Sequence, residues 1–156
     1  MNTFAATCME NIGHLSVLPA KMDKLNMPEF PPAKASGFLM GGKGRSWMVK
    51  TAAGNFAVSM AASKDLCSIS AQNIPAGAAQ QAFDRQFRFS ADGIEAQSLP
   101  NQLIQDGRMM ISSVQWTAPN MPFDLLFTFT TSANPQVADR PGVLTVRQQP
   151  HQALSR

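Results

Sequence analysis

Charged residues are scarce in this chain, and several residue types that carry chemistry are rare or missing. Only 15% of the 156 residues are charged, there are two histidines and two cysteines, and tyrosine is absent. The net charge of +3 is small and the basic residues are scattered, which does not indicate a nucleic acid or a membrane surface as the partner. No apolar run approaches the roughly 20 residues that a membrane span requires.

What is present predicts a folded domain. Hydrophobic residues make up 44% of the sequence, and 156 residues suffice for one buried core. We expect a single domain over residues 1–149 and a flexible tail over residues 150–156. Residues 1–20 lack both the basic start and the apolar run of a secretion leader. The chain is therefore either cytoplasmic or a mature form whose leader has been removed.

The two cysteines bear on this choice. Phe4, Cys8 and Ile12 recur every four residues, so they line one face of a helix. Cys67 and Ile69 alternate on one face of a strand. Both thiols thus point toward a core and can meet in a disulfide, which persists in an oxidising compartment. The alternative is a pair of buried free thiols. Two cysteines and the distant His14 and His151 show no ligand spacing, so no zinc site or other metal site is expected.

Three helices are predicted. The first runs from Thr3 to Ile12, and the second from Ser16 to Leu25, with a proline in its first turn. The third begins at Pro75 and buries Ala79, Phe83 and Phe87. Between the second helix and the first strand, "NMPEFPPAKASG" has three prolines in five residues, which predicts a loop with neither helix nor central strand.

The strands indicate an antiparallel sheet. Residues 46–70 alternate and are broken by short turns, which is typical of a three-stranded meander. Residues 94–106 are ambiguous, and three further strands follow in "RMMISSVQWT", "DLLFTFTTS" and "VLTVRQQ". The order ααβββαβββ predicts an α+β fold with about six strands and with helices on one face, while Ser and Thr suggest partial solvation of the other face.

The stretch "GFLMGGKGRS" resembles a phosphate-binding loop but lacks its context. No buried strand precedes it, Gly44 takes the place of the Ser or Thr that binds magnesium, and a strand rather than a helix follows. We therefore expect no nucleotide and no other cofactor. Lys43 and Arg45 remain candidates for contact with an anionic partner.

Catalysis has no positive support in the sequence. Neither histidine lies in a recognisable nucleophile motif, and acids such as Asp65, Asp106 and Asp124 resemble turn formers. Trp47 and Trp116 are expected in the core. In the loop "TAPNMPF", Met121 and Phe123 either pack back on the domain or contact a partner.

Several of these features together resemble a known family. Phe4-Ala-Ala-Thr7-Cys8 on an opening helix, Gly44 and Trp47 at the start of a meander, Phe56-x-Val58, Cys67-Ser-Ile69 and an Ala-rich helix look like a family of small uncharacterised proteobacterial envelope proteins. The resemblance covers residues 4–90. It implies an α+β fold and a secreted or lipid-anchored chain, and it implies no activity.

From these observations we expect a periplasmic protein, with its leader removed, that acts without catalysis by binding another protein. An immunity protein that neutralises a bacterial toxin is one such protein, and Lys43, Arg45, Met121 and Phe123 are the candidate contact residues. The alternative is a carrier or sensor that holds a lipid or metabolite between the helices and the sheet. An envelope hydrolase is a third hypothesis.

Overall fold

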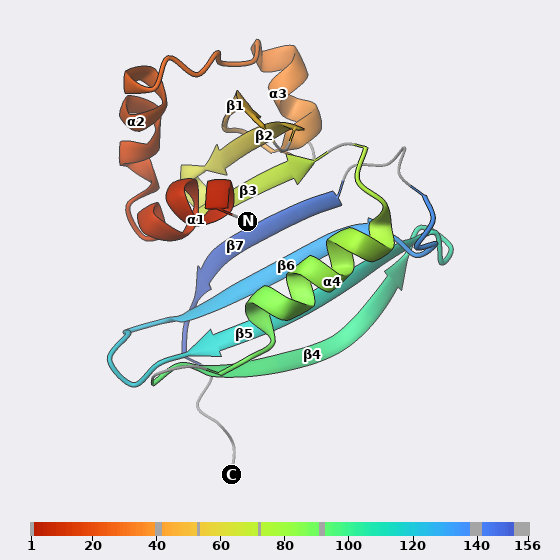
Figure 1. Ribbon diagram of the computed structural model, residues 1–156. Coiled ribbons are helices and arrows are strands. Elements are labelled where there is room, and N and C mark those ends of the chain that lie inside the picture. The colour runs from red at the N-terminus through yellow and green to blue at the C-terminus, as the bar shows by residue number, and fades with distance from the viewer. Residues whose placement is uncertain are drawn as a thin grey trace.

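A computed structural model describes residues 2–39, 42–52, 54–71, 73–90, 93–137 and 142–151. The α-helices in these ranges are α1 (Asn2–Thr7), α2 (Leu18–Lys24), α3 (Pro32–Phe38) and α4 (Ala76–Phe87). The strands are β1 (Arg45–Thr51), β2 (Gly54–Ala61), β3 (Leu66–Ala71), β4 (Glu95–Ile104), β5 (Met109–Thr117), β6 (Asp124–Ser132) and β7 (Gly142–Gln149) (Figure 1). No described helix has the length and apolar character needed to cross a membrane.

All seven strands form one antiparallel sheet in the order β1-β2-β3-β7-β6-β5-β4. The α+β class and the meander of β1, β2 and β3 are confirmed. The expected number of about six strands is too low, because the ambiguous segment 94–106 contains β4. Its pattern is irregular for a physical reason: β4 is an edge strand with a bulge between Leu99 and Gln102, and Pro100 lies inside this bulge.

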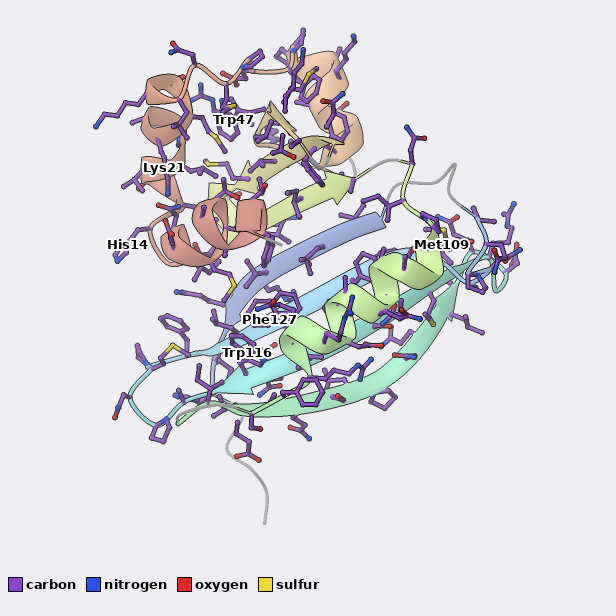
Figure 2. All side chains as sticks on the ribbon, viewed as in Figure 1. His14, Lys21, Trp47, Met109, Trp116 and Phe127 are labelled. Carbon is purple, nitrogen blue, oxygen red and sulfur yellow. A yellow bond between two sulfur atoms is a disulfide. The ribbon has the colours of Figure 1, made fainter. Side chains whose placement is uncertain are left out.

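The first face of the sheet carries the hydrophobic core. Residues of α1, α2 and α4 pack on alternate strand positions, which include Trp47, Val58, Ile69, Phe127 and Val146. The ring of Phe127 stacks on that of Phe87 of α4, with centroids 4.5 Å apart. Figure 2 shows Trp116 and Phe127 beside α4, and the Trp116 indole donates a hydrogen bond to the Phe87 carbonyl at 2.8 Å. Both tryptophans thus belong to the core, as expected.

The first helix is shorter than the predicted Thr3–Ile12. It ends at Thr7 and a 3-10 turn, Met9–Asn11, follows. The Asn11 side chain donates to the Thr7 carbonyl at 2.6 Å, whereas the Asn11 backbone N–H bonds to the Cys8 carbonyl. The amide side chain therefore occupies the acceptor that a continuous helix would use.

A disulfide joins Cys8 to Cys67 and so ties the N-terminal segment to β3. Both cysteines are fully buried. Beside them, the backbone N–H of Gly13 donates to the Asp65 carboxylate at 3.2 Å, which fixes the same segment to the turn before β3. The expected disulfide is confirmed, and the alternative of two free thiols is not.

The second face of the sheet carries small polar residues and is not free of helices. A row of hydroxyl residues crosses six adjacent strands in register: Ser46, Ser59, Ser68, Thr145, Thr128 and Ser113. The expectation that helices cover one face only is wrong, because α3 packs over the second face of β1 and β2. The Pro-rich segment was expected to contain no helix, yet α3 begins at Pro32. A proline in the first turn has no intrahelical N–H to lose, so only helix interiors are closed to it.

Candidate functional site

Two contacts position α3 against the sheet. Residues 28–30 run along the outer edge of β1, where the Phe30 N–H bonds to the Ser46 carbonyl and the Met48 N–H bonds to the Pro28 carbonyl. The ring of Phe30 then meets that of Phe38, at the end of α3, with centroids 4.9 Å apart. Ala35, between these two points, is 3% exposed and faces inward. The edge of β1 and one aromatic pair therefore hold the helix over the strands.

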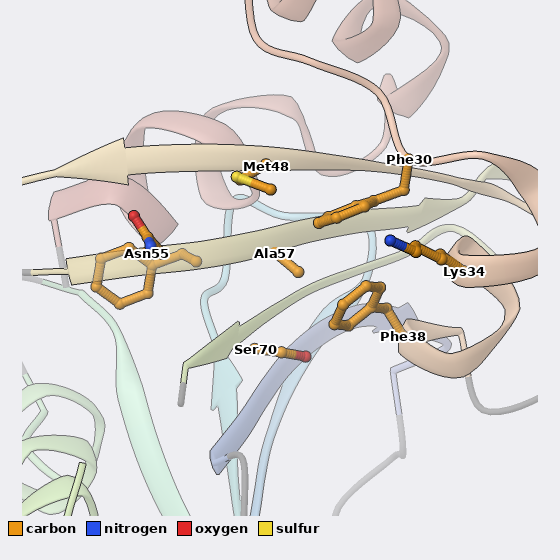
Figure 3. A pocket seen from close by; sticks show the side chains of 8 residues that line it. Phe30, Lys34, Phe38, Met48, Asn55, Ala57 and Ser70 are labelled. Atoms are coloured by element: carbon orange, nitrogen blue, oxygen red, sulfur yellow. The ribbon is translucent and has the colours of Figure 1, made fainter. Parts of the chain in front are cut away.

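Between α3 and the strands lies a cleft of about 410 Å³ (Figure 3). We call it the α3 cleft. Its walls are mostly apolar. The side chains that line it come from the segment 30–38 and from the three strands of the meander: Phe30, Lys34, Phe38, Met48, Asn55, Phe56, Ala57 and Ser70. A half-open cleft of this size is within the range of about 300–1,000 Å³ that small-molecule sites occupy.

The polar groups of the α3 cleft have no partners within the described part of the chain. Lys34 lies one helical turn before Phe38, on the same side of α3, and forms no ion pair with any described residue. Ser70 is 4% exposed, and its hydroxyl makes no hydrogen bond to the described residues. The same holds for the side chain of Asn55. These groups are available to a ligand.

The charge around the α3 cleft is positive. No Asp or Glu is among the described residues that line it. Lys50 pairs with Asn55 across β1 and β2, and strand alternation places it on the same face as Met48. The nearby carboxylate of Glu29 is occupied by Arg45, whose Nε and Nη2 donate to its two oxygens at 2.8 and 2.5 Å. This hydrogen-bonded pair lowers the pKa of Glu29.

A second polar cluster surrounds Asp124, whose side chain is buried. Gln115 Nε2 donates to Asp124 Oδ2 at 2.7 Å, and His151 Nδ1 donates to Asp124 Oδ1 at 2.7 Å. His151 Nε2 faces the carbonyl of Met121. Because a carbonyl and a carboxylate only accept, both contacts are satisfied by the imidazolium form alone. The bond to the Met121 carbonyl, and then the bond to Asp124, raise the pKa of His151.

The contacts of this second cluster hold His151 against Asp124 and the Met121 carbonyl, which is a structural role rather than proton transfer. Both ring nitrogens of His151 are already used, so neither is free to accept a proton from a substrate. His151 also lines a hollow of about 400 Å³ with Ser90 and Glu95 among its walls. The sequence suggested that Asp124 is a turn former, but its carboxylate is buried and hydrogen-bonded instead. His151, which belongs to the expected tail, is bonded to it. Residues 152–156 lie outside the described residues.

The four residues expected to contact a partner do not form one surface. Lys43 is exposed, and Arg45 is paired with Glu29 and stacked over the Trp47 ring at 5.1 Å. Met121 and Phe123 pack against the core. They precede β6, which is separated from β1 by three strands in the sheet, or about 19 Å at the usual strand spacing. The structure thus separates the basic pair from the apolar pair.

The sequence reasoning missed the residues that form the α3 cleft. Phe30, Lys34 and Phe38 lie in or just after a segment that was expected to be a loop, and Ser70 was not singled out. One sequence feature could have found the helix: two prolines followed by Ala-Lys-Ala, which is a typical helix start.

The described residues offer little support for a metal site or for a second ligand site. They contain no group of three or more His, Cys, Asp or Glu side chains that could hold a metal ion. A third hollow, of about 190 Å³, lies between α1, α4 and the sheet and is almost wholly apolar, with Ala78, Ala82 and Phe83 among its walls. None of the described residues that line it carries a charge that could orient a ligand.

Comparisons with family models, with curated proteins and with solved structures found no match to this chain. The resemblance to an envelope family therefore stays a prediction. Any statement about function has to rest on the geometry of the sites described above.

Proposed function

We propose that this protein binds a small organic molecule in the α3 cleft, as a non-catalytic carrier or sensor. The observation that carries the proposal is the composition of that cleft: aromatic and aliphatic walls combined with polar groups that have no partner within the described chain. Walls of this kind supply affinity through apolar burial, and a few polar groups supply orientation.

The lining of the α3 cleft suits binding better than catalysis. The described residues that line it include no imidazole, thiol or carboxylate, so they supply no acid and base pair of the kind that most hydrolytic and transfer reactions use. Lys34 is a charged group on an exposed position rather than a desolvated amine. Such a site holds a molecule and releases it unchanged.

We also propose that the protein works in the periplasm. The disulfide between Cys8 and Cys67 is compatible with an oxidising compartment, where such bonds form and persist. A carrier or sensor there would meet molecules that have crossed the outer surface of the cell.

Native mass spectrometry of protein purified without denaturation tests the proposal, because a carrier should retain a bound molecule. The matched variant is Ala57→Leu, which places a larger side chain in the α3 cleft from a residue that is 5% exposed. Its control is Ala33→Leu, at an exposed position of α3 outside the lining.

We expect the bound mass to disappear in Ala57→Leu and to persist in Ala33→Leu, while both variants unfold cooperatively in urea. If the wild type retains no molecule and also fails to bind any compound of a chemically varied panel, the proposal is wrong. Binding that survives Ala57→Leu unchanged would place the ligand elsewhere and would equally refute it.

A further inference from the structure

The charge and the aromatic walls of the α3 cleft allow its ligand class to be narrowed. We propose that the cleft takes a small aromatic carboxylate, with the ring against Phe30 and Phe38 and the carboxylate on the ammonium of Lys34. This inference rests on the proposed function, because it names the ligand of the same site.

The sign of the ligand charge follows from the groups around the cleft. Lys34 projects from α3 toward the strands (Figure 3), and it has no ion pair within the described residues. Lys50 lies on the same face, next to Asn55 of the lining. Both oxygens of the neighbouring Glu29 are held by Arg45. An anion would therefore be attracted to an uncompensated positive field, and a cation would be repelled.

The aromatic body follows from the walls. The rings of Phe30 and Phe38 are 4.9 Å apart and inclined by 33°, and both residues are partly exposed, so ring surface remains for contact with a third ring. The thioether of Met48 lines the same space, and sulfur contacts with rings are favourable. A flat ring matches these walls better than a flexible chain, which would lose more conformational freedom on binding.

The hydroxyl of Ser70 adds a point of orientation. It is 4% exposed, it lines the cleft, and it makes no hydrogen bond to a described residue. The hydroxyl can therefore donate to or accept from a polar ligand atom, and such a hydrogen bond would fix the orientation of the ring. We therefore expect ring compounds with one polar substituent besides the carboxylate to bind more tightly than unsubstituted ones.

Isothermal titration calorimetry with four probes tests the inference: 2-naphthoate, the neutral 2-naphthamide, the cationic 2-naphthylmethylammonium, and the aliphatic decanoate. We expect 2-naphthoate to bind at least about tenfold more tightly than 2-naphthamide, which corresponds to one charge-assisted hydrogen bond. The cationic probe should show no binding. Decanoate should bind more weakly than 2-naphthoate.

Lys34→Gln and Lys64→Gln form a matched pair, since each removes one exposed lysine and the second lies on the turn Ala62–Lys64, outside the cleft lining. Lys34→Gln should weaken 2-naphthoate about tenfold and leave 2-naphthamide unchanged, and Lys64→Gln should change neither. Ser70→Ala should leave 2-naphthoate unchanged and weaken 6-hydroxy-2-naphthoate, the substituted probe. Amide chemical shifts of Ala57 and Ser70 should move with 2-naphthoate.

The outcomes separate this inference from the proposed function. If 2-naphthamide binds as tightly as 2-naphthoate, and Ala57→Leu abolishes both, the cleft binds ligands but the anionic class is wrong. If decanoate binds more tightly than 2-naphthoate, the aromatic class is wrong. Equal losses in Lys34→Gln and Lys64→Gln would refute the role of Lys34. If no probe binds and natively purified protein carries no ligand, both the inference and the proposed function fall.

Discussion

Reduction of the disulfide should remove a large part of the stability of this domain. Cys8 and Cys67 are 59 positions apart. On the chain-entropy model, a crosslink that closes a loop of this length contributes about 4 kcal/mol by restricting the unfolded chain. Small domains have a total free energy of unfolding of about 5–15 kcal/mol. The bond is therefore a major term for this fold.

Urea denaturation, followed by the fluorescence of Trp47 and Trp116, measures the effect. Because both cysteines are fully buried, the protein has to be unfolded and reduced before it is refolded under reductant. With a denaturant slope of about 2 kcal/mol per molar, a loss of about 4 kcal/mol lowers the urea midpoint by about 2 M. The reduced thiols still occupy the same positions in the core, so this comparison leaves the packing nearly constant.

Equal urea midpoints of the oxidised and reduced proteins would contradict this expectation. If the oxidised and reduced proteins unfold at midpoints within about 0.3 M of each other, the unfolded chain gains no freedom from reduction and the entropic reasoning is wrong. The double variant Cys8→Ala and Cys67→Ala serves as the second comparison. It should be less stable than the reduced protein, because it also loses the packing of two buried sulfur atoms.

Three further perturbations follow from the contacts. A Cβ on Gly44 would collide with the Met60 carbonyl oxygen, so Gly44→Ala should lower the free energy of unfolding by about 1–3 kcal/mol. A Cβ on Gly37 would have no atom within 4 Å, so Gly37→Ala should raise it by about 0.5–1 kcal/mol. Equal effects of the two variants in urea denaturation would contradict the contact at Gly44. Phe127→Ala removes a fully buried ring and should cost about 3–5 kcal/mol, and a cost below about 1 kcal/mol would show that the aromatic stack is not what holds α4. His151 has a raised pKa, so the stability that it adds is present below its ordinary value of about 6.5 and is lost as the pH rises through the raised value. The difference in stability between wild type and His151→Gln should therefore shrink as the pH rises above the ordinary value of about 6.5, and a difference that grows with pH would reverse our assignment of the imidazolium.

The sequence was informative wherever one periodicity dominated a segment. Alternation located β1, β2, β3, β5 and β6, and the four-residue spacing of Phe83 and Phe87 located α4. The same patterns placed Cys8 and Cys67 toward one core, which was enough to predict the disulfide. In each of these segments large apolar side chains recur on the face that packs in the core, so local sequence and tertiary packing agree.

Prediction failed where two influences compete within one segment. β4 is an edge strand with a bulge, and its burial alternates poorly because little covers either side of it. In α3, the prolines outweighed the helix formers in our reading, although a proline at the start of a helix is harmless. Asp124 resembled a turn residue because the partners that bury it, Gln115 and His151, are remote in sequence.

The candidate site could not be predicted from local pattern, because it depends on which face α3 covers. Lys34 and Phe38 become cleft residues only when the edge of β1 brings Phe30 beside them. The alternation of the meander does not predict that a helix covers its polar face. The position of a short helix over a sheet is set by a few side-chain contacts rather than by periodicity.

The strands beneath α3 show why a cleft remains there. On β2 and β3, the first face carries Val58 and Ile69, which fill the core to ordinary density. The adjacent positions on the second face carry Ala57 and Ser70, whose small side chains cannot reach the helix above them. Leucine or isoleucine at these two positions would close the space and add apolar burial, at no cost to strand propensity. The small residues therefore leave space unfilled in the same place where the cation of Lys34 and the hydroxyl of Ser70 line the cleft. Substitution of Ala57 and Ser70 together by leucine should therefore raise the urea midpoint above that of the wild type while it abolishes ligand binding. A double variant that loses both stability and binding would show instead that the small residues are needed for the fold.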